Sequence, residues 1–165
     1  MDPIDRTLEA AAGYLALGMP EDAAAELASL PEGELQSPAA MQLRLQMAVA
    51  EEHWTIGVGI GTDLIQSAPE NPSAYILTSY CLRELERVEE ARETLMDGPD
   101  SLREEPIFYY NLACYESLLG AIEVSHEWLK RALELDPNMA PEARKDRDLE
   151  NLRAAVGEDF CGAFV

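Results

Sequence analysis

A period of 34 residues is the feature of this sequence that most constrains its fold. Repeats that begin at Ile4, Pro38, Pro72 and Pro106 follow one another without an insertion, and a further segment begins at Ala140. Two aligned columns hold small residues almost throughout: Ala11, Leu45, Ser79 and Ala113 in one, and Ala23, Gly57, Ala91 and Ser125 in the other. Helix axes approach within about 8 to 10 Å where the contact residues are small. Each repeat is therefore predicted to be a pair of packed helices.

Hydrophobic spacing predicts where these helices lie. Apolar residues within each repeat recur at i, i+3, i+4 and i+7, and Gly and Pro fall between the segments. We predict first helices near 4–17, 38–51, 72–85 and 106–119, and second helices near 21–30, 54–68, 88–97 and 122–136. Residues 140–156 are predicted to form one capping helix with an apolar inner face made of Ala143, Leu149, Leu152 and Val156.

Two stretches carry a family resemblance. The run YYNLACYESLLGAIEVSHEWLKRALELDPN resembles the tetratricopeptide repeat (TPR), with matches at Leu112, Ala113, Gly120, Ser125, Ala132 and Pro137. The run AAAGYLALGMPEDAAAELASL matches in the same register at Ala11, Tyr14, Gly18, Ala23 and Leu27. The resemblance implies an all-α fold, a right-handed α-solenoid of four 34-residue helical hairpins plus a C-terminal capping helix. It gives one domain over 4–156, with repeats 4–37, 38–71, 72–105 and 106–139, the capping helix 140–156 and a tail 157–165.

Charge and composition exclude several classes of partner. Residues 1–165 carry 12 basic and 32 acidic side chains, a net charge of −20, which repels phosphate backbones and anionic membranes. We therefore expect neither nucleic acid nor a membrane as partner. Arg6 and Arg44 are the basic residues of positions 1–82, so any anion site is expected late in the chain. The acidic N-terminus and the lack of a long apolar run predict a cytoplasmic protein.

The residues that commonly carry catalysis or bind metals are few and scattered. Cys81, Cys114 and Cys161 form no Cys-x-x-Cys pair, and His53 and His126 lack a metal-binding spacing. We expect reduced thiols, a solvated His126, no metal, no cofactor and no enzymatic activity.

The stretch GVGIG has a glycine spacing that suggests a phosphate-binding loop, but its context does not. No buried strand precedes it and no Lys-Ser/Thr follows it. The 34-residue register places Gly57 and Gly61 on one face of a second helix, where they are predicted to allow close packing. Because each helical glycine costs about 1 kcal/mol relative to alanine, we expect this helix to be the least regular in the array, with a kink or a hinge.

The family resemblance implies recognition of a peptide or protein in a concave groove lined by the first helices. The residues predicted to line it are Leu8, Gln42, Gln46, Ile76, Tyr80, Arg83, Tyr110, Asn111 and Cys114. Tyr80 and Tyr110 are the predicted binding hot spots. The alternative, that these tyrosines pack between neighbouring repeats, is equally open for Tyr80.

The predicted function is a non-catalytic module that binds a protein or peptide segment with apolar anchors and basic flanks. The alternative is a small acidic chaperone for a secreted or basic partner protein. The tail adds a further choice, because Phe160, Phe164 and Val165 either fold back on the capping helix or insert into another molecule, including a second copy.

Overall fold

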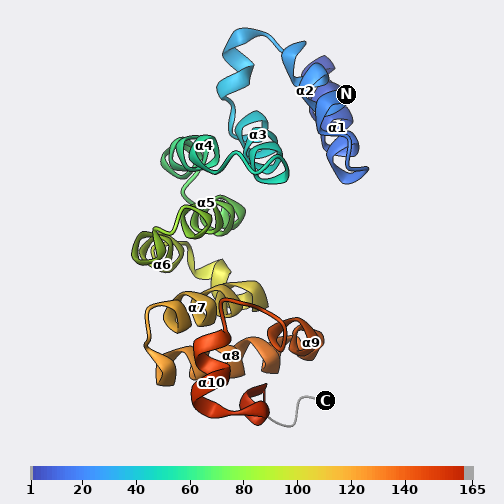
Figure 1. Cartoon of the computed structure of the whole chain (residues 1–165). Coiled ribbons are helices and arrows are strands. Elements are labelled where there is room, and N and C mark those ends of the chain that lie inside the picture. Colours follow the sequence, from blue (N-terminus) through green and yellow to red (C-terminus); the bar gives the residue numbers. More distant parts are fainter. Residues whose placement is uncertain (1, 162–165) are drawn as a thin grey trace. The chain divides into compact units, whose positions relative to one another are not determined.

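The computed structural model describes residues 2–161, without the side chains of residues 158 and 159, and the regular structure of this part is entirely helical. The first helices of the repeats are α1 (Pro3–Ala16), α3 (Pro38–Ala50), α5 (Pro72–Glu84) and α7 (Pro106–Leu118) (Figure 1). The second helices are α2 (Pro20–Ala28), α4 (Trp54–Ser67), α6 (Val88–Met96) and α8 (Ile122–Leu135). Short 3₁₀ turns are η1 (Glu32–Gln36), η2 (Asp100–Glu104), η3 (Pro137–Met139) and η4 (Glu158–Cys161). The predicted helices are thus present, with ends that differ by one or two residues.

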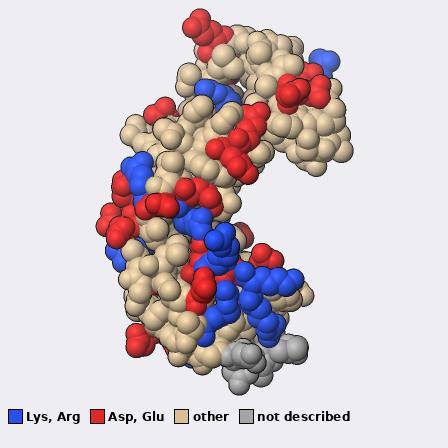
Figure 2. All heavy atoms as spheres, viewed as in Figure 1, with Lys and Arg blue, Asp and Glu red and all other residues tan. Residues whose placement is uncertain are grey.

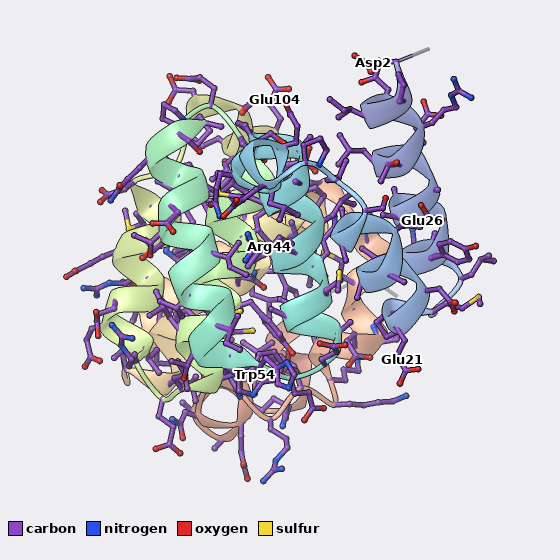
Figure 3. The ribbon with its side chains drawn as sticks, turned by 90° about the horizontal axis from the view of Figure 1, so that it is seen from above. Asp2, Glu21, Glu26, Arg44, Trp54 and Glu104 are labelled. Atoms are coloured by element: carbon purple, nitrogen blue, oxygen red, sulfur yellow. The ribbon has the colours of Figure 1, made fainter. Side chains whose placement is uncertain are left out.

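The chain divides into two compact units, with the boundary between Leu85 and Glu86. The first unit contains the hairpins α1–α2 and α3–α4 together with α5. Its apolar cores comprise Ala11, Ala23, Leu27, Leu30, Ala40 and Leu43 in one cluster, and Met41, Leu45, Leu64 and Ala74 in another. The second unit contains α6, the hairpin α7–α8 and the C-terminal helices. Figure 3 shows Asp2 at the start of α1 and Glu21 on α2 at the rim of the first unit.

Each first helix ends in the same backbone conformation. Gly18, Glu52, Glu86 and Gly120 lie 34 residues apart, and their φ angles are 71°, 58°, 61° and 80°. At three of these turns, the residue that follows donates its N–H to the carbonyl five residues earlier. The His53 N–H, for example, donates to the Ala48 carbonyl at 2.8 Å. An L-residue in this left-handed region costs about 1 kcal/mol, so Glu52 and Glu86 adopt it at a cost that glycine avoids. The 34-residue register is therefore present in the backbone as well as in the sequence.

The start of each first helix follows from its local sequence. Proline occupies the opening turn of α1, α3, α5 and α7, where its missing N–H breaks no helical hydrogen bond. Side chains of Asp2, Ser37 and Asn71 cap three of these helices by accepting a backbone N–H.

Gly57 and Gly61 of α4 serve close packing, as predicted. A Cβ on Gly57 would meet the Cys81 sulfur at 2.6 Å, and a Cβ on Gly61 would overlap the Thr78 hydroxyl. A Cβ on Gly59 would meet nothing within 4 Å. The helix nevertheless runs unbroken from Trp54 to Ser67. The helix is therefore not broken, because close contact with α5 offsets the low helix propensity of glycine; the expected kink or hinge stays a prediction.

The single capping helix predicted for residues 140–156 is also wrong in form. The structure has two short helices, α9 (Ala140–Ala143) and α10 (Glu150–Val156), joined by an irregular segment. The Asp146 carboxylate accepts the Asp148 N–H at 2.9 Å, and this turn competes with continued helix. The Arg153 guanidinium donates to the carbonyls of Ala143 and Asp146 and so satisfies the end of α9. The predicted inward face is otherwise correct at Ala143, Leu149 and Leu152, whereas Val156 is 40% exposed.

Candidate functional site

Six of the predicted groove residues lie on the first helices of the first unit. Gln46 is exposed, Leu8 and Ile76 are half-buried, and Tyr80 is 39% exposed. The Arg83 guanidinium is half-buried and pairs with the Glu84 carboxylate at 2.9 Å. The accessible part of this set is therefore on the later two helices, α3 and α5.

Gln42, also on α3, has a structural role. Its side-chain amide donates to the Ser73 hydroxyl at 3.0 Å and accepts from the Asn71 amide at 2.9 Å. Asn71 is the residue that caps α5, and its side-chain oxygen accepts the Ser73 N–H. Gln42 thus ties α3 to the start of α5, and its polar atoms are already satisfied within the chain.

An aromatic pair connects α4 and α5. The rings of Tyr80 on α5 and Trp54 on α4 pack edge to face, with centroids 5.7 Å apart and planes at 81°. This geometry suits the aromatic quadrupoles and contributes about 0.5 to 1.5 kcal/mol beyond burial. Tyr80 therefore packs within the chain, as one of its two interpretations predicted. It is also 39% exposed, so it can contact a partner as well.

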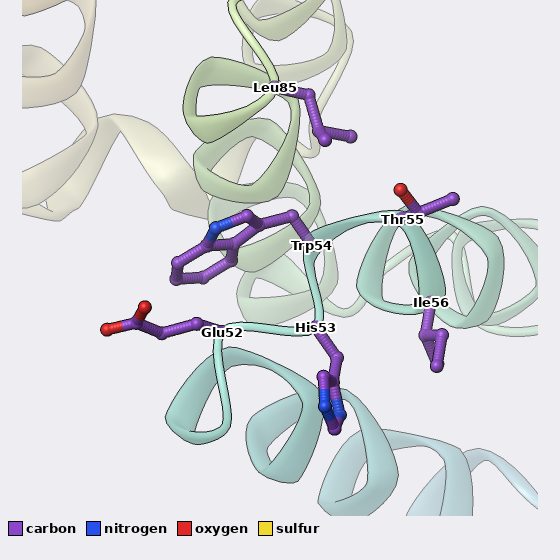
Figure 4. A pocket seen from close by; sticks show the side chains of 6 residues that line it. All are labelled: Glu52, His53, Trp54, Thr55, Ile56 and Leu85. Atoms are coloured by element: carbon purple, nitrogen blue, oxygen red, sulfur yellow. The ribbon is translucent and has the colours of Figure 1, made fainter.

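Trp54 also lines a shallow pocket of about 300 Å³. We call this the Trp54 pocket; it is formed by Glu52, His53, Trp54, Thr55, Ile56 and Leu85. Figure 4 shows Glu52 and His53 on the turn between α3 and α4, Trp54, Thr55 and Ile56 on the first turn of α4, and Leu85 at the end of α5. Ile56, a large aliphatic side chain, is 57% exposed. The pocket therefore presents apolar surface to solvent beside the aromatic pair.

Carboxylates line this apolar surface or are next to its residues in sequence. Glu52 lines the pocket, and Glu51 contacts the His53 ring with 3.3 Å between Oε2 and Nδ1. Glu84 and its partner Arg83 precede Leu85 on α5. The left-handed backbone at Glu52 creates the tight turn that brings the ends of α3 and α4 together and sets Trp54 as the first residue of α4.

Sequence reasoning did not include Trp54, Ile56 or Leu85 among the predicted binding residues. A signal was available: the 34-residue register sets the start of each second helix beside the end of the first helix that follows it. Residues 54–56 and 85 could therefore have been paired, and the charged residues Asp22 and Glu90 in the column of Ile56 indicated an exposed position.

The predicted groove residues of the second unit are placed differently. Tyr110 and Cys114 on α7 are 6% and 4% exposed, and Asn111 is half-buried. The Tyr110 hydroxyl donates to an Asp146 carboxylate oxygen at 2.7 Å, and the Cys114 sulfur lies 3.7 Å from the same oxygen. Burial, aided by the neighbouring Asp146 carboxylate, raises the pKa of Tyr110. The prediction that Tyr110 and Cys114 are exposed in a groove is wrong, because the segment between α9 and α10 covers them.

The C-terminal segment continues over the same hairpin. The Leu152 N–H donates to the Ser117 hydroxyl, and the Asn151 amide donates to the Ser117 carbonyl. Phe160 is 2% exposed, with its carbonyl 3.0 Å from His126 Nε2. Phe160 thus folds back on its own chain, and His126 is half-buried against it and not fully solvated as expected. Phe164 and Val165 lie outside the described residues.

Among the described residues, Cys114, Asp146 and Asp148 have metal-ligating atoms within 4.8 Å of one another. Hydrogen bonds already account for this cluster: Asp146 accepts from the Tyr110 hydroxyl through one oxygen and from the Asp148 N–H through the other. A cation would have to replace the Tyr110 bond, so we interpret the cluster as a clasp between α7 and the C-terminal segment.

Solved structures share this arrangement of helices at low sequence identity. MamA from Desulfovibrio magneticus RS-1, residues 41 to the end, gives a TM-score of 0.78 at 16% identity, covering 99% of this chain and 90% of that chain. TTC0263, described as a thermophilic TPR protein in Thermus thermophilus, gives 0.73 at 18% identity over 92% and 87%. PilF of Pseudomonas aeruginosa gives 0.73 at 22% identity over 96% and 74%. No protein-family model and no curated protein matches the sequence.

The chain has the tetratricopeptide-repeat fold. The resemblance predicted from the 34-residue period is confirmed at the level of the fold, including its solenoid architecture. Within residues 2–161, the TPR helices are too short or too polar to cross a membrane.

Proposed function

We propose that the chain is a protein–protein interaction module whose first unit binds a segment of a partner protein. The partner lies along the exposed side of α3 and α5, contacts Gln46, Ile76 and Tyr80, and inserts an apolar side chain into the Trp54 pocket. The TPR fold supports this role in general terms, because proteins with this fold commonly serve as interaction scaffolds. Fold alone does not identify a site, so the proposal depends on the residues.

The observation that carries the proposal is the exposed apolar surface around the Trp54–Tyr80 pair. Ile56 and Tyr80 are 57% and 39% exposed; Ile56 lines the pocket with Trp54, and Tyr80 packs against the Trp54 ring. Rigid aromatic side chains next to a pocket are the usual anchors of protein interfaces. A partner residue that fills the pocket removes Ile56 and Leu85 from water, at about 25 cal/mol per Å² of apolar surface.

The negative charge around the pocket favours basic residues on either side of the partner's apolar anchor. Glu51, Glu52 and Glu84 lie beside the apolar surface, and the whole chain carries −20. A Lys or Arg next to the apolar anchor would gain from this field, mainly in association rate. We therefore propose a segment with one aromatic or aliphatic anchor and adjacent basic residues.

A displayed library of short random peptides selected against the full chain tests this proposal. We expect enriched peptides to combine an apolar anchor with Lys or Arg, and to lose about tenfold or more in affinity to Tyr80→Ala and Ile56→Ala variants. Val124→Ala is the matched control, because Val124 is 45% exposed on α8 in the second unit. Enriched peptides that bind both first-unit variants as tightly as the wild type would exclude this site.

A chaperone for a basic partner protein is the second candidate. Besides Ile56, the first unit exposes Leu17 and Met19 at the turn between α1 and α2, at 74% and 40%. Exposed apolar turns within an acidic surface suit transient contact with an incompletely folded basic chain. Suppression of aggregation of a basic model protein, but not of an acidic one, would favour this role over selective peptide binding.

A further inference from the structure

In the irregular segment between α9 and α10, the cations are exposed and the carboxylates are buried or half-buried. Its sequence, Arg-Lys-Asp-Arg-Asp from Arg144 to Asp148, alternates cations with carboxylates. The three cations are exposed, whereas Asp146 is half-buried and Asp148 is 9% exposed. The local surface is therefore basic although the sequence is nearly balanced. Figure 2 shows Lys and Arg side chains gathered over the part of the second unit that contains this segment.

Bonds to the rest of the second unit fix this orientation. Asp146 is held inward by the Tyr110 hydroxyl and by the Asp148 N–H. Arg153 donates to the carbonyls of Ala143 and Asp146, so this fourth cation is used to hold the backbone. Ala143 and Leu149, on either side of the segment, are fully buried. The exposed cations thus project from an anchored backbone, which lowers the entropy that a ligand must overcome to order them.

The three cations also differ from half of the chain's basic residues in having no carboxylate partner among the side chains that the structure describes. Ion pairs with neighbouring carboxylates occupy Arg83, Arg87, Arg92, Arg103, Lys130 and Arg131. Arg144, Lys145 and Arg147 form no ion pair with the side chains that the structure describes. In a chain with 32 acidic residues, three adjacent cations without such a partner are a distinct surface.

We infer that Arg144, Lys145 and Arg147 form a docking site for an acidic segment of a protein partner, rich in Asp and Glu. Guanidinium groups bind carboxylates through two parallel N–H···O bonds, and two of the three cations are arginines. The net charge of −20 favours a short acidic segment over an extended polyanion, because the rest of the surface repels a long chain of phosphates. Glu142 and Glu150 are exposed on the flanking helices and limit the length of the favourable contact. This site is separate from the Trp54 pocket and does not depend on the function proposed for it.

Binding of a fluorescein-labelled peptide of Asp and Glu to the full chain tests the inference. The variant reverses the three charges with Arg144→Glu, Lys145→Glu and Arg147→Glu. The matched control, Arg87→Glu, Lys130→Glu and Arg131→Glu, makes the same change in net charge at exposed residues of the second unit that already have partners. We expect the first variant to bind about tenfold or more weakly than the wild type, and the control to bind about as tightly as the wild type.

Further ligands distinguish the acidic segment from other anions. A peptide with Asn and Gln in place of Asp and Glu should not bind, and oligothymidylate and vesicles of phosphatidylcholine with phosphatidylserine should bind more weakly than the acidic peptide. The inference is overturned if the acidic peptide does not bind, if both triple variants weaken it equally, or if oligothymidylate or vesicles bind more tightly through the same three residues. Thermal unfolding of both variants, whose substituted residues are all exposed, ensures that binding is compared between folded proteins.

Discussion

The first helices α5 and α7 occupy equivalent positions in consecutive repeats, yet they present different surfaces. Tyr80 on α5 and Cys114 on α7 share a column, and their exposed fractions are 39% and 4%. Ile76 and Tyr110 share another column, and Tyr110 alone is buried. The difference comes from the C-terminal segment, whose Asp146 and Leu152 bond to Tyr110 and Ser117 of α7. Whether a repeat column can meet a partner is thus decided by the segment after the last repeat as well as by the register.

The largest effect is expected when a core residue of α10 is truncated. Leu152 is fully buried in the second unit, so Leu152→Ala should lower the free energy of unfolding by about 2 to 5 kcal/mol. It should also loosen the cover on α7 and speed alkylation of Cys114, measured by mass spectrometry. Val156→Ala is the control, because Val156 is 40% exposed on the same helix and should change stability by less than about 0.5 kcal/mol. Unaltered Cys114 reactivity in a destabilised Leu152→Ala chain would contradict the role of α10 as a cover.

The next test concerns the close packing of α4 against α5, the helix that carries the exposed Tyr80. Gly61→Ala places a Cβ against Thr78, whose hydroxyl is fixed by a 2.6 Å bond to the Ala74 carbonyl. We expect a loss of about 1 to 3 kcal/mol in denaturant unfolding, because the closely packed helices must separate. Gly59→Ala, in open space on the same helix, should instead stabilise the chain by up to about 1 kcal/mol. Equal effects of the two substitutions would contradict the packing role of Gly61.

A smaller effect is expected when the clasp on α7 loses one hydrogen bond. Tyr110→Phe keeps the ring but removes the hydroxyl that donates to Asp146, and this should cost about 1.5 kcal/mol in the free energy of unfolding. Tyr109→Phe is the control on the same helix, since its hydroxyl bonds an exposed carbonyl at Arg103 and should matter less. A Tyr110→Phe chain as stable as the wild type would show that Asp146 finds an equivalent partner without Tyr110.

The repeat period predicted most of the fold because it is a local property recorded in every repeat. Small residues such as Ala23 and Gly57 mark where helices meet, and proline marks where first helices begin, so helix ends were correct to within two residues. The break at Asp146 was missed because the local turn to Asp148 and the bonds with Tyr110 and Arg153 that hold it are not part of the helical period. Helical periodicity alone cannot show that such a turn is more stable than a continuous helix.

The candidate site was predictable only in part, and for a related reason. The register placed Tyr80 and Gln46 on the accessible side of the first helices, where both are exposed. It also placed Tyr110 on this accessible side, but Tyr110 is buried. A repeat column carries no information about a segment outside the repeats that covers one of its residues. Ile56 was overlooked because it is apolar, although its column holds Asp22 and Glu90, which are exposed like Ile56 itself.

The smallest expected effect concerns Cys81, on the buried side of α5, and the way the free energy of unfolding depends on pH. Burial, together with the Glu84 carboxylate, raises the pKa of the Cys81 thiol from 9.0 to about 11. Because the folded pKa is raised, the stabilisation is complete below pH 9 and is lost as the pH rises from 9 to about 11. At pH 10 the loss from this group is about 1 kcal/mol. Denaturant unfolding from pH 8 to 11 should therefore show a shallower alkaline decline for Cys81→Ala than for the wild type. Cys114→Ala is the control on α7, and identical declines for the wild type and Cys81→Ala would show that the Cys81 thiol ionises without loosening the contact between α4 and α5.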